Sequence, residues 1–549
     1  MNPQRETVRR FMAIAAPAAV LSIGALSPVP TIAASCDALA RVKIDNTTID
    51  AAELHPAGAY TPAGGAEIAG LPAFCRVHGV ITPVEGSHVD LEAWLPEADW
   101  NGKIEMLGNG GYSSAISYPA MADQLKRGYA AVATDTGHKG DDPDFAVGHP
   151  EAIVDWASRA AHVSIDATKA VVSDFYGQAA RHAYFWGCST GGQQALSEAQ
   201  RYPKDFDGIL AGDPGNNRTH LNAGFFWQFV KNHRSSDLSV IVPPEKLALI
   251  TDAVVKACRG KDGGAESDEF LTDPDACAFQ PVDLLCKGAD APDCLTREQV
   301  DAMVAMYGGA HDPKTGEQIF YGWPKGSENS GRVVKALPGW SLYWADPAHP
   351  DRPARLNFWR IWAFQDPNWD WRTFDFDAGM KTVDDRLAST INAMNPDLSA
   401  FRAAGGKLIQ YHGLADPVAP PRDSIDYYER VQAAEEGAKL PRADASGDFY
   451  RLFLAPGLYH CQGGPGPNVL DVQGALEKWV EQGIAPETIA ATKYRDDNPS
   501  EGVMMSRPLC PYPKRAHYNG AGDPAEASSF SCVEAARYPN PLPAAAYLR

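Results

Sequence analysis

Residues 182–199 read HAYFWGCSTGGQQALSEA, and this stretch combines three local signals. The apolar run at 182–186 is typical of a buried strand, and the pattern at 192–199 predicts a helix. Between them lies GCSTG at 187–191, a serine motif flanked by glycines. A serine in a sharp strand-to-helix turn is the context of a nucleophile elbow, where bulkier neighbours would clash. Ser189 is therefore the predicted nucleophile.

Further short apolar runs, each ending in glycine or a polar turn, recur along the chain and predict buried parallel strands. Helical patterns lie between several of them, for example at residues 161–175. Alternating strands and helices predict an α/β doubly wound sheet of the α/β-hydrolase type. The predicted strands cover residues 103–107, 129–134, 182–186, 208–212, 407–412 and 450–455.

The alternation stops after about residue 216 and resumes near residue 402, and the segment between is rich in Trp, Pro, Gly and acidic residues. We expect a lid domain inserted at 216–394, with the catalytic domain formed by 36–215 and 395–549. An independent second domain is the alternative. Residues 1–35 predict an export signal peptide, because arginines precede an apolar stretch and small residues suited to cleavage. We thus expect an exported protein, periplasmic or secreted.

The composition limits the classes of partner. The formal net charge of the 549 residues is −20, and no basic run is present, which disfavours nucleic acid as a partner. Beyond the export signal no stretch resembles a membrane span, so we expect no membrane partner. A hydrophobic content of 44% with 13 tryptophans predicts a large packed core. The sequence leaves the oligomeric state open.

The chain has ten cysteines, and an even number behind an export signal favours disulfides over thiols. Two of them, Cys188 and Cys461, directly adjoin Ser189 and His460. A bond between them would hold their α-carbons within about 7 Å and clamp the serine beside the histidine. Sequence neighbourhood leaves these two for each other, because it suggests Cys36 with Cys75, Cys258 with Cys277, Cys286 with Cys294, and Cys510 with Cys532.

Two later residues complete a candidate triad. In hydrolases of this sheet type an acid and then a histidine follow the serine, each after a later strand. Asp416 follows the strand that ends at His412, and His460 follows the strand at 450–455. We predict that Asp416 orients His460, which accepts the proton of Ser189. A turn-capping Asp and a packed loop His are the alternatives, and His412 is the rival base.

Acyl transfer also needs backbone donors aimed at the developing oxyanion. The amide of Thr190, directly after the nucleophile, is one predicted donor. The other is Gly111 in the glycine-rich run GNGGY at 108–112. A tight turn is the alternative, because a phosphate loop would need a Lys-Ser or Lys-Thr end that this run lacks. This chemistry needs no organic cofactor.

The motif GCS at 187–189, Asp416, His460 with Cys461, the GNGG run and the further cysteine pairs resemble the tannase and feruloyl esterase family. That family includes mono(2-hydroxyethyl) terephthalate hydrolase, and the similarity spans nearly all of the mature chain. The resemblance implies a serine carboxylic ester hydrolase that acts on small esters of aromatic acids, of feruloyl or galloyl type, through an acyl-enzyme. Terephthalate monoester hydrolysis is the alternative within the family, and a noncatalytic binding protein on a hydrolase scaffold is the alternative outside it.

Family lids commonly hold a structural calcium ion in an Asp-rich loop. The resemblance assigns the carboxylates of Asp262 and Asp268 and the carbonyls of Gly264 and Phe270 as its ligands. Arg259 stands where a first Asp is expected, so a plain acidic surface loop is the alternative.

The lid also carries many aromatic residues, most of which we expect in a core. The sequence does not show which of them contacts substrate. Arg360 is a candidate for binding a substrate carboxylate. Where the terephthalate-ester hydrolase has Glu after its nucleophile, this chain has Thr190.

Overall fold

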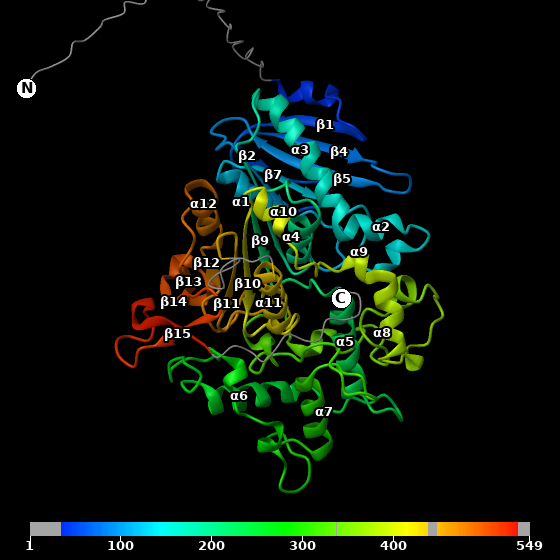
Figure 1. Cartoon of the computed structure of the whole chain (residues 1–549), viewed down its shortest axis with the longest axis vertical. Coiled ribbons are helices and arrows are strands. Elements are labelled where there is room, and N and C mark those ends of the chain that lie inside the picture. The colour runs from blue at the N-terminus through cyan, green and yellow to red at the C-terminus, as the bar shows by residue number, and fades with distance from the viewer. Residues whose placement is uncertain (1–33, 336, 438–446, 536–549) are drawn as a thin grey trace, which may run out of the picture.

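The computed structural model describes residues 34–335, 337–437 and 447–535. The predicted export signal lies outside these residues, except for its last two positions. A nine-stranded sheet runs through the molecule in the order β1-β4-β5-β7-β6-β8-β9-β10-β11 (Figure 1). Its strands are β1 (Thr47–His55), β4 (Phe74–Ile81), β5 (Val89–Pro96), β6 (Lys103–Leu107), β7 (Ala130–Thr134), β8 (His182–Cys188), β9 (Gly208–Gly212), β10 (Lys407–Gly413) and β11 (Tyr450–Ala455).

The sheet is antiparallel from β1 through β5 to β7 and parallel from β7 to β11. The parallel strands are covered on both faces, which explains why they are apolar runs in the sequence. The helices α3 (Ala160–Tyr176), α4 (Thr190–Arg201) and α11 (Pro421–Gly437) contribute to the hydrophobic core on one face. The helices α1 (Tyr118–Lys126) and α12 (Val472–Gln482) contribute to the cores on the other. The predicted doubly wound α/β-hydrolase sheet is confirmed.

All of the predicted strands are present in this sheet, and β6, β9 and β11 have the predicted bounds. The sequence reading missed the antiparallel strands β1, β4 and β5. In β4 buried and partly exposed residues mostly alternate, a weaker signal than a continuous apolar run.

Most of the chain between β9 and β10 forms a layer of helices and loops over one end of the sheet (Figure 1). It has its own aromatic core, in which Trp340, Trp359 and Trp362 are buried. Most of the predicted lid aromatics are therefore core residues, as expected. Its helices are α5 (Arg218–Asn232), α6 (Leu247–Cys258), α7 (Arg297–Gly308), α8 (Ala378–Val383) and α9 (Ser389–Ile391). The helix α10 (Ser399–Ala403) instead lies beside α4 and contributes Phe401 to the core of the sheet.

Small sheets complete the fold at the periphery. Among the described residues, none of the helices combines the length and apolar character needed to cross a membrane. All ten cysteines form the five predicted disulfides. The remaining elements are α2 (Glu151–Val154), the hairpin β2 (Gly58–Tyr60) and β3 (Ile68–Leu71), the sheet of β12 (Val469–Leu470), β13 (Ile489–Tyr494) and β14 (Val503–Leu509), and the pair β15 (Lys514–Tyr518) and β16 (Phe530–Glu534).

Candidate active site

Ser189 occupies a strained turn between β8 and α4. Its φ is 63° and its ψ is −118°, a backbone conformation that residues other than glycine rarely adopt. The turn is so tight that a Cβ atom on Gly187 would lie 2.3 Å from the carbonyl oxygen of Gly191. Glycine is therefore required at 187, and a Cβ on Gly191 would also be crowded, at 3.1 Å from the carbonyl oxygen of Asn109. Such crowding is the steric signature of a nucleophile elbow.

The disulfide between Cys188 and Cys461 joins the serine turn to the histidine loop. The α-carbons of the two cysteines are 5.9 Å apart although 273 positions separate them in the sequence. Ser189 and His460, their chain neighbours, line one cavity of about 630 Å³. This cavity lies beyond the carboxyl ends of the parallel strands, where α/β sheets generally bind their ligands.

Asp416 holds the ring of His460. His460 Nδ1 donates to Asp416 Oδ2 at 2.7 Å, which leaves Nε2 of the ring available to another group. The carboxylate is fully buried, and its Oδ1 accepts the backbone amides of Val418 at 2.7 Å and Ala419 at 3.0 Å. The structure thus places the predicted acid and base in the expected contact.

The electrostatics of this pair favour charge on both groups. Burial by itself raises the pKa of Asp416, but the charges of and hydrogen bonds from His460 and His412 outweigh it and lower that pKa. Burial lowers the pKa of His460, but Asp416 and then Asp213 outweigh that effect and raise it above the ordinary value. A protonated imidazole is therefore stabilised at this position.

His412, the rival base, is fully buried at the end of β10. Its Nε2 donates to the carbonyl oxygen of Ala419 at 2.9 Å, and its Nδ1 bonds to the hydroxyl of Ser424 at 2.6 Å. Both ring nitrogens are occupied, and the ring does not line the cavity. The geometry therefore favours His460 as the base.

The predicted oxyanion donors come from the start of α4, directly after Ser189, and from the loop after β6, which lines the same cavity as Ser189. Thr190 is the first residue of α4, so its amide is not used within the helix. Gly111 has a φ of 58° and lines the cavity in the loop after β6. Asn109 anchors this loop, because its amide donates to Gln194 of α4 at 3.0 Å and its side chain to the Thr134 carbonyl at 3.0 Å.

Two arginines that were not predicted from the sequence face the cavity. Arg218, at the start of α5, is buried and donates to the Thr190 hydroxyl at 2.6 Å. Arg355 donates to the hydroxyl of Tyr343 at 2.9 Å. Arg360, the candidate from sequence, does not line the cavity and instead donates to the Trp369 carbonyl at 3.2 Å. Arg218 could have been predicted as a site residue, because it follows shortly after the parallel strand β9. Arg355 lies in an irregular segment that carries no such signal.

Neither cavity arginine forms an ion pair among the described residues. Both guanidinium groups lie over the ring of Tyr112, at 5.8 Å for Arg218 and 5.2 Å for Arg355. Burial lowers the pKa of Arg218 to about 10, which leaves it charged at neutral pH. The cavity therefore presents uncompensated positive charge to whatever binds in it.

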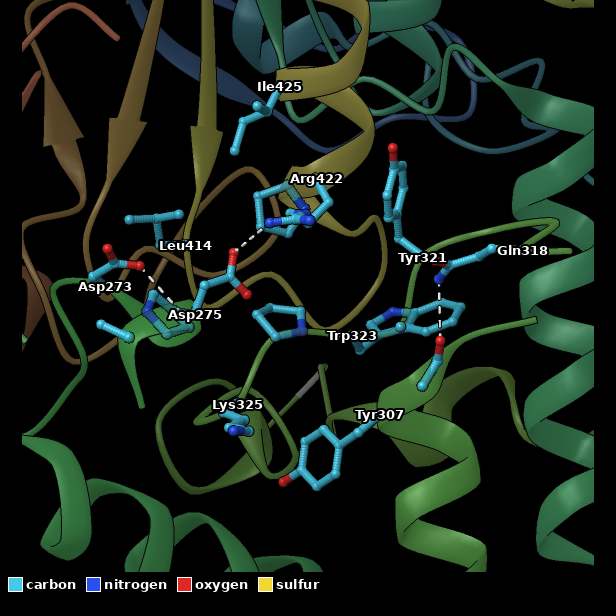
Figure 2. Close-up of a pocket in the computed structure, with 16 residues that line it drawn as sticks. Asp273, Asp275, Tyr307, Gln318, Tyr321, Trp323, Lys325, Leu414, Arg422 and Ile425 are labelled. Atoms are coloured by element: carbon cyan, nitrogen blue, oxygen red, sulfur yellow. Dashed lines mark hydrogen bonds and ion pairs between the residues drawn. The ribbon is translucent and has the colours of Figure 1, made fainter. Parts of the chain in front are cut away.

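A second cavity, of about 490 Å³, lies between the inserted segment and the start of α11 (Figure 2). Tyr321 and Trp323 form part of its wall, and Arg422 extends toward Asp275, with which it pairs at 3.2 Å. Lys325 donates to the carbonyl of Cys277 at 2.5 Å. Neither Ser189 nor His460 lines this cavity, so it is distinct from the candidate active site.

The predicted calcium loop is bound to the C-terminal sheets through arginine. Asp268 Oδ1 accepts from the buried Arg507 of β14 at 2.7 Å, and Asp268 Oδ2 accepts the Ala265 amide at 2.9 Å. Asp262 accepts the amides of Gly264 at 3.2 Å and Thr272 at 2.5 Å. The guanidinium already balances Asp268, one of the two carboxylates assigned as ligands. This donor set does not fit a cation that requires about six to eight oxygens.

Comparisons with known proteins agree with the geometry. The family described as tannase and feruloyl esterase matches residues 75–533. An uncharacterized esterase of Xanthomonas campestris is 37% identical over 94% of each chain. A probable feruloyl esterase B of Aspergillus clavatus is 31% identical over 93% of this chain and 98% of its own. The crystal structure of feruloyl esterase B from Aspergillus oryzae superimposes with a TM-score of 0.81 at 27% identity, covering 91% of this chain and all of the other.

Proposed function

The chain belongs to the tannase and feruloyl esterase family, and on this basis we propose that it is an exported serine esterase that hydrolyses carboxylic esters of aromatic acids. The acyl group is of feruloyl, other hydroxycinnamoyl, or galloyl type. The observation that carries the proposal is the disulfide between Cys188 and Cys461 beside the His460–Asp416 hydrogen bond. These contacts bring Ser189 and an oriented imidazole to one cavity.

In the proposed reaction Ser189 Oγ attacks the ester carbonyl while His460 Nε2 accepts its proton. Asp416 holds the ring in the tautomer that exposes Nε2 and stabilises the imidazolium that forms. The amides of Thr190 and Gly111 bind the oxyanion of the tetrahedral intermediate. His460 then protonates the departing alcohol, which leaves the acyl group on Ser189.

Water then hydrolyses the acyl-enzyme by the same steps, with water as the nucleophile and Ser189 as the leaving group. His460 takes a proton from a water molecule that attacks the acyl carbon, and Ser189 leaves with that proton. The products are the aromatic acid and the alcohol. No step of this reaction involves a metal ion or an organic cofactor.

Export is proposed from the N-terminal signal pattern together with the five disulfides, which persist in oxidising compartments. The destination is the periplasm or the medium. The proposed partner is a small aromatic ester.

The uncompensated arginines favour a second candidate substrate, a monoester of terephthalate. A free carboxylate on the acyl ring would pair with the guanidinium of Arg355 or Arg218, and such charge-assisted bonds are strong when buried. A neutral feruloyl or galloyl ring would leave both charges unpaired in the cavity. This candidate shares the entire reaction described above and differs only in the acyl group.

The test is ester hydrolysis by the mature, disulfide-bonded protein and by Ser189→Ala. The substrates are methyl ferulate, methyl gallate, a terephthalate monoester and a medium-chain aliphatic ester. We expect turnover of at least one aromatic ester and its loss in the variant. Preference for the terephthalate monoester that is lost in Arg355→Gln supports the second candidate. Equal hydrolysis by Ser189→Ala, or turnover of the aliphatic ester alone, contradicts the proposal.

A further inference from the structure

Asp213 is a buried carboxylate that the predicted triad does not include. It follows β9 directly and is completely inaccessible to solvent. Its φ is 36°, in the positive range that, apart from glycine, mainly asparagine and aspartate adopt. Backbone strain of this kind costs about 1–3 kcal/mol and persists where surrounding contacts enforce it, often at functional sites.

The two oxygens of Asp213 connect the segments that carry the predicted acid and base. Oδ1 accepts the amide of Gly413 at 2.7 Å, at the end of β10 and just before the Asp416 turn. Oδ2 accepts the amide of Cys461 at 3.1 Å, directly after His460. The backbone amide of Asp213 donates to the Tyr411 carbonyl at 2.9 Å, which fixes the carboxylate relative to β10. One side chain thus sets the spacing of the acid turn and the histidine loop.

The carboxylate of Asp213 also lies close to the ring of His460. Side-chain ligand atoms of Asp213, Asp416 and His460 all lie within 4.8 Å of one another. His412 is the other titratable group in contact, with its Nε2 3.7 Å from Asp213 Oδ1. Two carboxylates and one further imidazole therefore surround His460, so that its protonation adds a positive charge beside two acids.

We propose that Asp213 is a positioning residue for His460. It holds the Cys461 amide so that the imidazole stays at Ser189, and its negative charge stabilises the imidazolium formed during the reaction. The inference rests on the proposed function, because it takes His460 as the base. It extends that function, since the triad then depends on a second acid that follows a different strand.

The test is Asp213→Asn in the mature, disulfide-bonded protein. Asparagine keeps the shape but offers one acceptor, so one of the two amides faces an NH₂ group instead. We expect kcat to fall about tenfold or more with little change in KM, since the loss falls on the transition state. The acid limb of kcat/KM should move to lower pH by about 1 unit, because a negative charge beside His460 is lost.

Glu328→Gln is the matched control. Glu328 is also a fully buried carboxylate, but it binds Thr251, Tyr307 and Gly326 within the inserted segment. Its loss should lower the melting temperature without moving the acid limb. If Asp213→Asn does not fold, Asp213→Glu retains the charge and should keep the limb in place while kcat falls.

The outcomes separate the two proposals. Wild-type kcat and an unmoved acid limb in Asp213→Asn would overturn the positioning role. The same would follow from a limb that moves equally in Glu328→Gln. Hydrolysis that survives in Ser189→Ala and His460→Ala would instead overturn the proposed function itself.

Discussion

At the scale of single residues, the carboxylate of Asp416 stands out because several donors surround it. It accepts from the ring of His460 and from two backbone amides, and Nε2 of His412 lies 3.3 Å from its Oδ2. A carboxylate that accepts from so many donors stays ionised down to low pH. Its role in the proposed reaction is to keep one imidazole oriented and basic.

This arrangement predicts the pH dependence of hydrolysis. Burial opposes protonation of His460, but Asp416 outweighs it and raises the pKa of His460. The active neutral ring is therefore lost as the pH falls through a pKa above the ordinary histidine value. Asp416→Asn should move that acid limb to lower pH and reduce kcat by about 10³ to 10⁴-fold. The measurement is kcat/KM for methyl ferulate across the pH range.

A second histidine–aspartate pair supplies the control for this experiment. His220 Nε2 lies 2.9 Å from Asp384 Oδ2 in the inserted segment, away from the cavity. Asp384→Asn makes the same chemical change and should leave the acid limb unmoved. An acid limb at the wild-type position in Asp416→Asn would contradict the assignment of Asp416 as the orienting acid.

At the scale of elements, the disulfide between Cys188 and Cys461 couples the end of β8 to the loop after β11. The double variant Cys188→Ala with Cys461→Ala should lose most activity although Ser189 remains, because His460 is no longer tied to the serine turn. Steady-state kinetics on the best ester measure this. Removing the Cys286–Cys294 bond, which closes a short loop in the inserted segment, is the control and should preserve turnover. Unchanged turnover in the first variant would refute the clamp.

The acidic loop between α6 and α7 gives a prediction about metal dependence. Because Arg507 balances Asp268, we expect the melting temperature to be the same in chelator and in excess calcium. Arg507→Gln leaves a buried carboxylate unpaired and should cost about 3–5 kcal/mol of stability. The exposed Lys514→Gln on β15 is the control for loss of a positive charge. A lower melting temperature of the wild type in chelator would show that calcium occupies the loop after all.

These elements also show what the sequence could and could not predict. The parallel strands and Ser189 were readable because buried strands are continuous apolar runs and the serine turn requires flanking glycines. Asp213 and Arg355 were not readable, because their importance comes from contacts across more than a hundred positions of sequence. Composition alone indicated Arg360, and its side chain donates to the Trp369 carbonyl instead.

At the scale of the whole molecule, buried carboxyls set how stability responds to pH. Glu105 on β6 is almost completely buried, and desolvation raises its pKa to about 8, which Arg127 only partly offsets. The folded protein therefore keeps a proton that the unfolded chain releases near pH 4.5. The stabilising contribution is full below that value and is lost as the pH rises toward 8.

Glu105→Gln removes this dependence. Relative to the wild type, the variant should gain at least about 1 kcal/mol of unfolding free energy on going from pH 5 to pH 8.5. Denaturant unfolding at the two pH values measures the difference. The exposed Glu487→Gln is the control and should show no such gain. If the unfolding free energies of Glu105→Gln and the wild type changed equally with pH, the raised pKa of Glu105 would be contradicted.

The disulfide between Cys188 and Cys461 has a consequence for proteolysis. It makes the chain from 188 to 461 a covalent ring, and the whole inserted segment belongs to that ring. A protease that cuts once between these cysteines opens the ring but releases no fragment. Ser189 and His460 then belong to different polypeptides that are still joined by the disulfide between Cys188 and Cys461. Such a nicked enzyme would run as one band on a gel without reductant and as two with it.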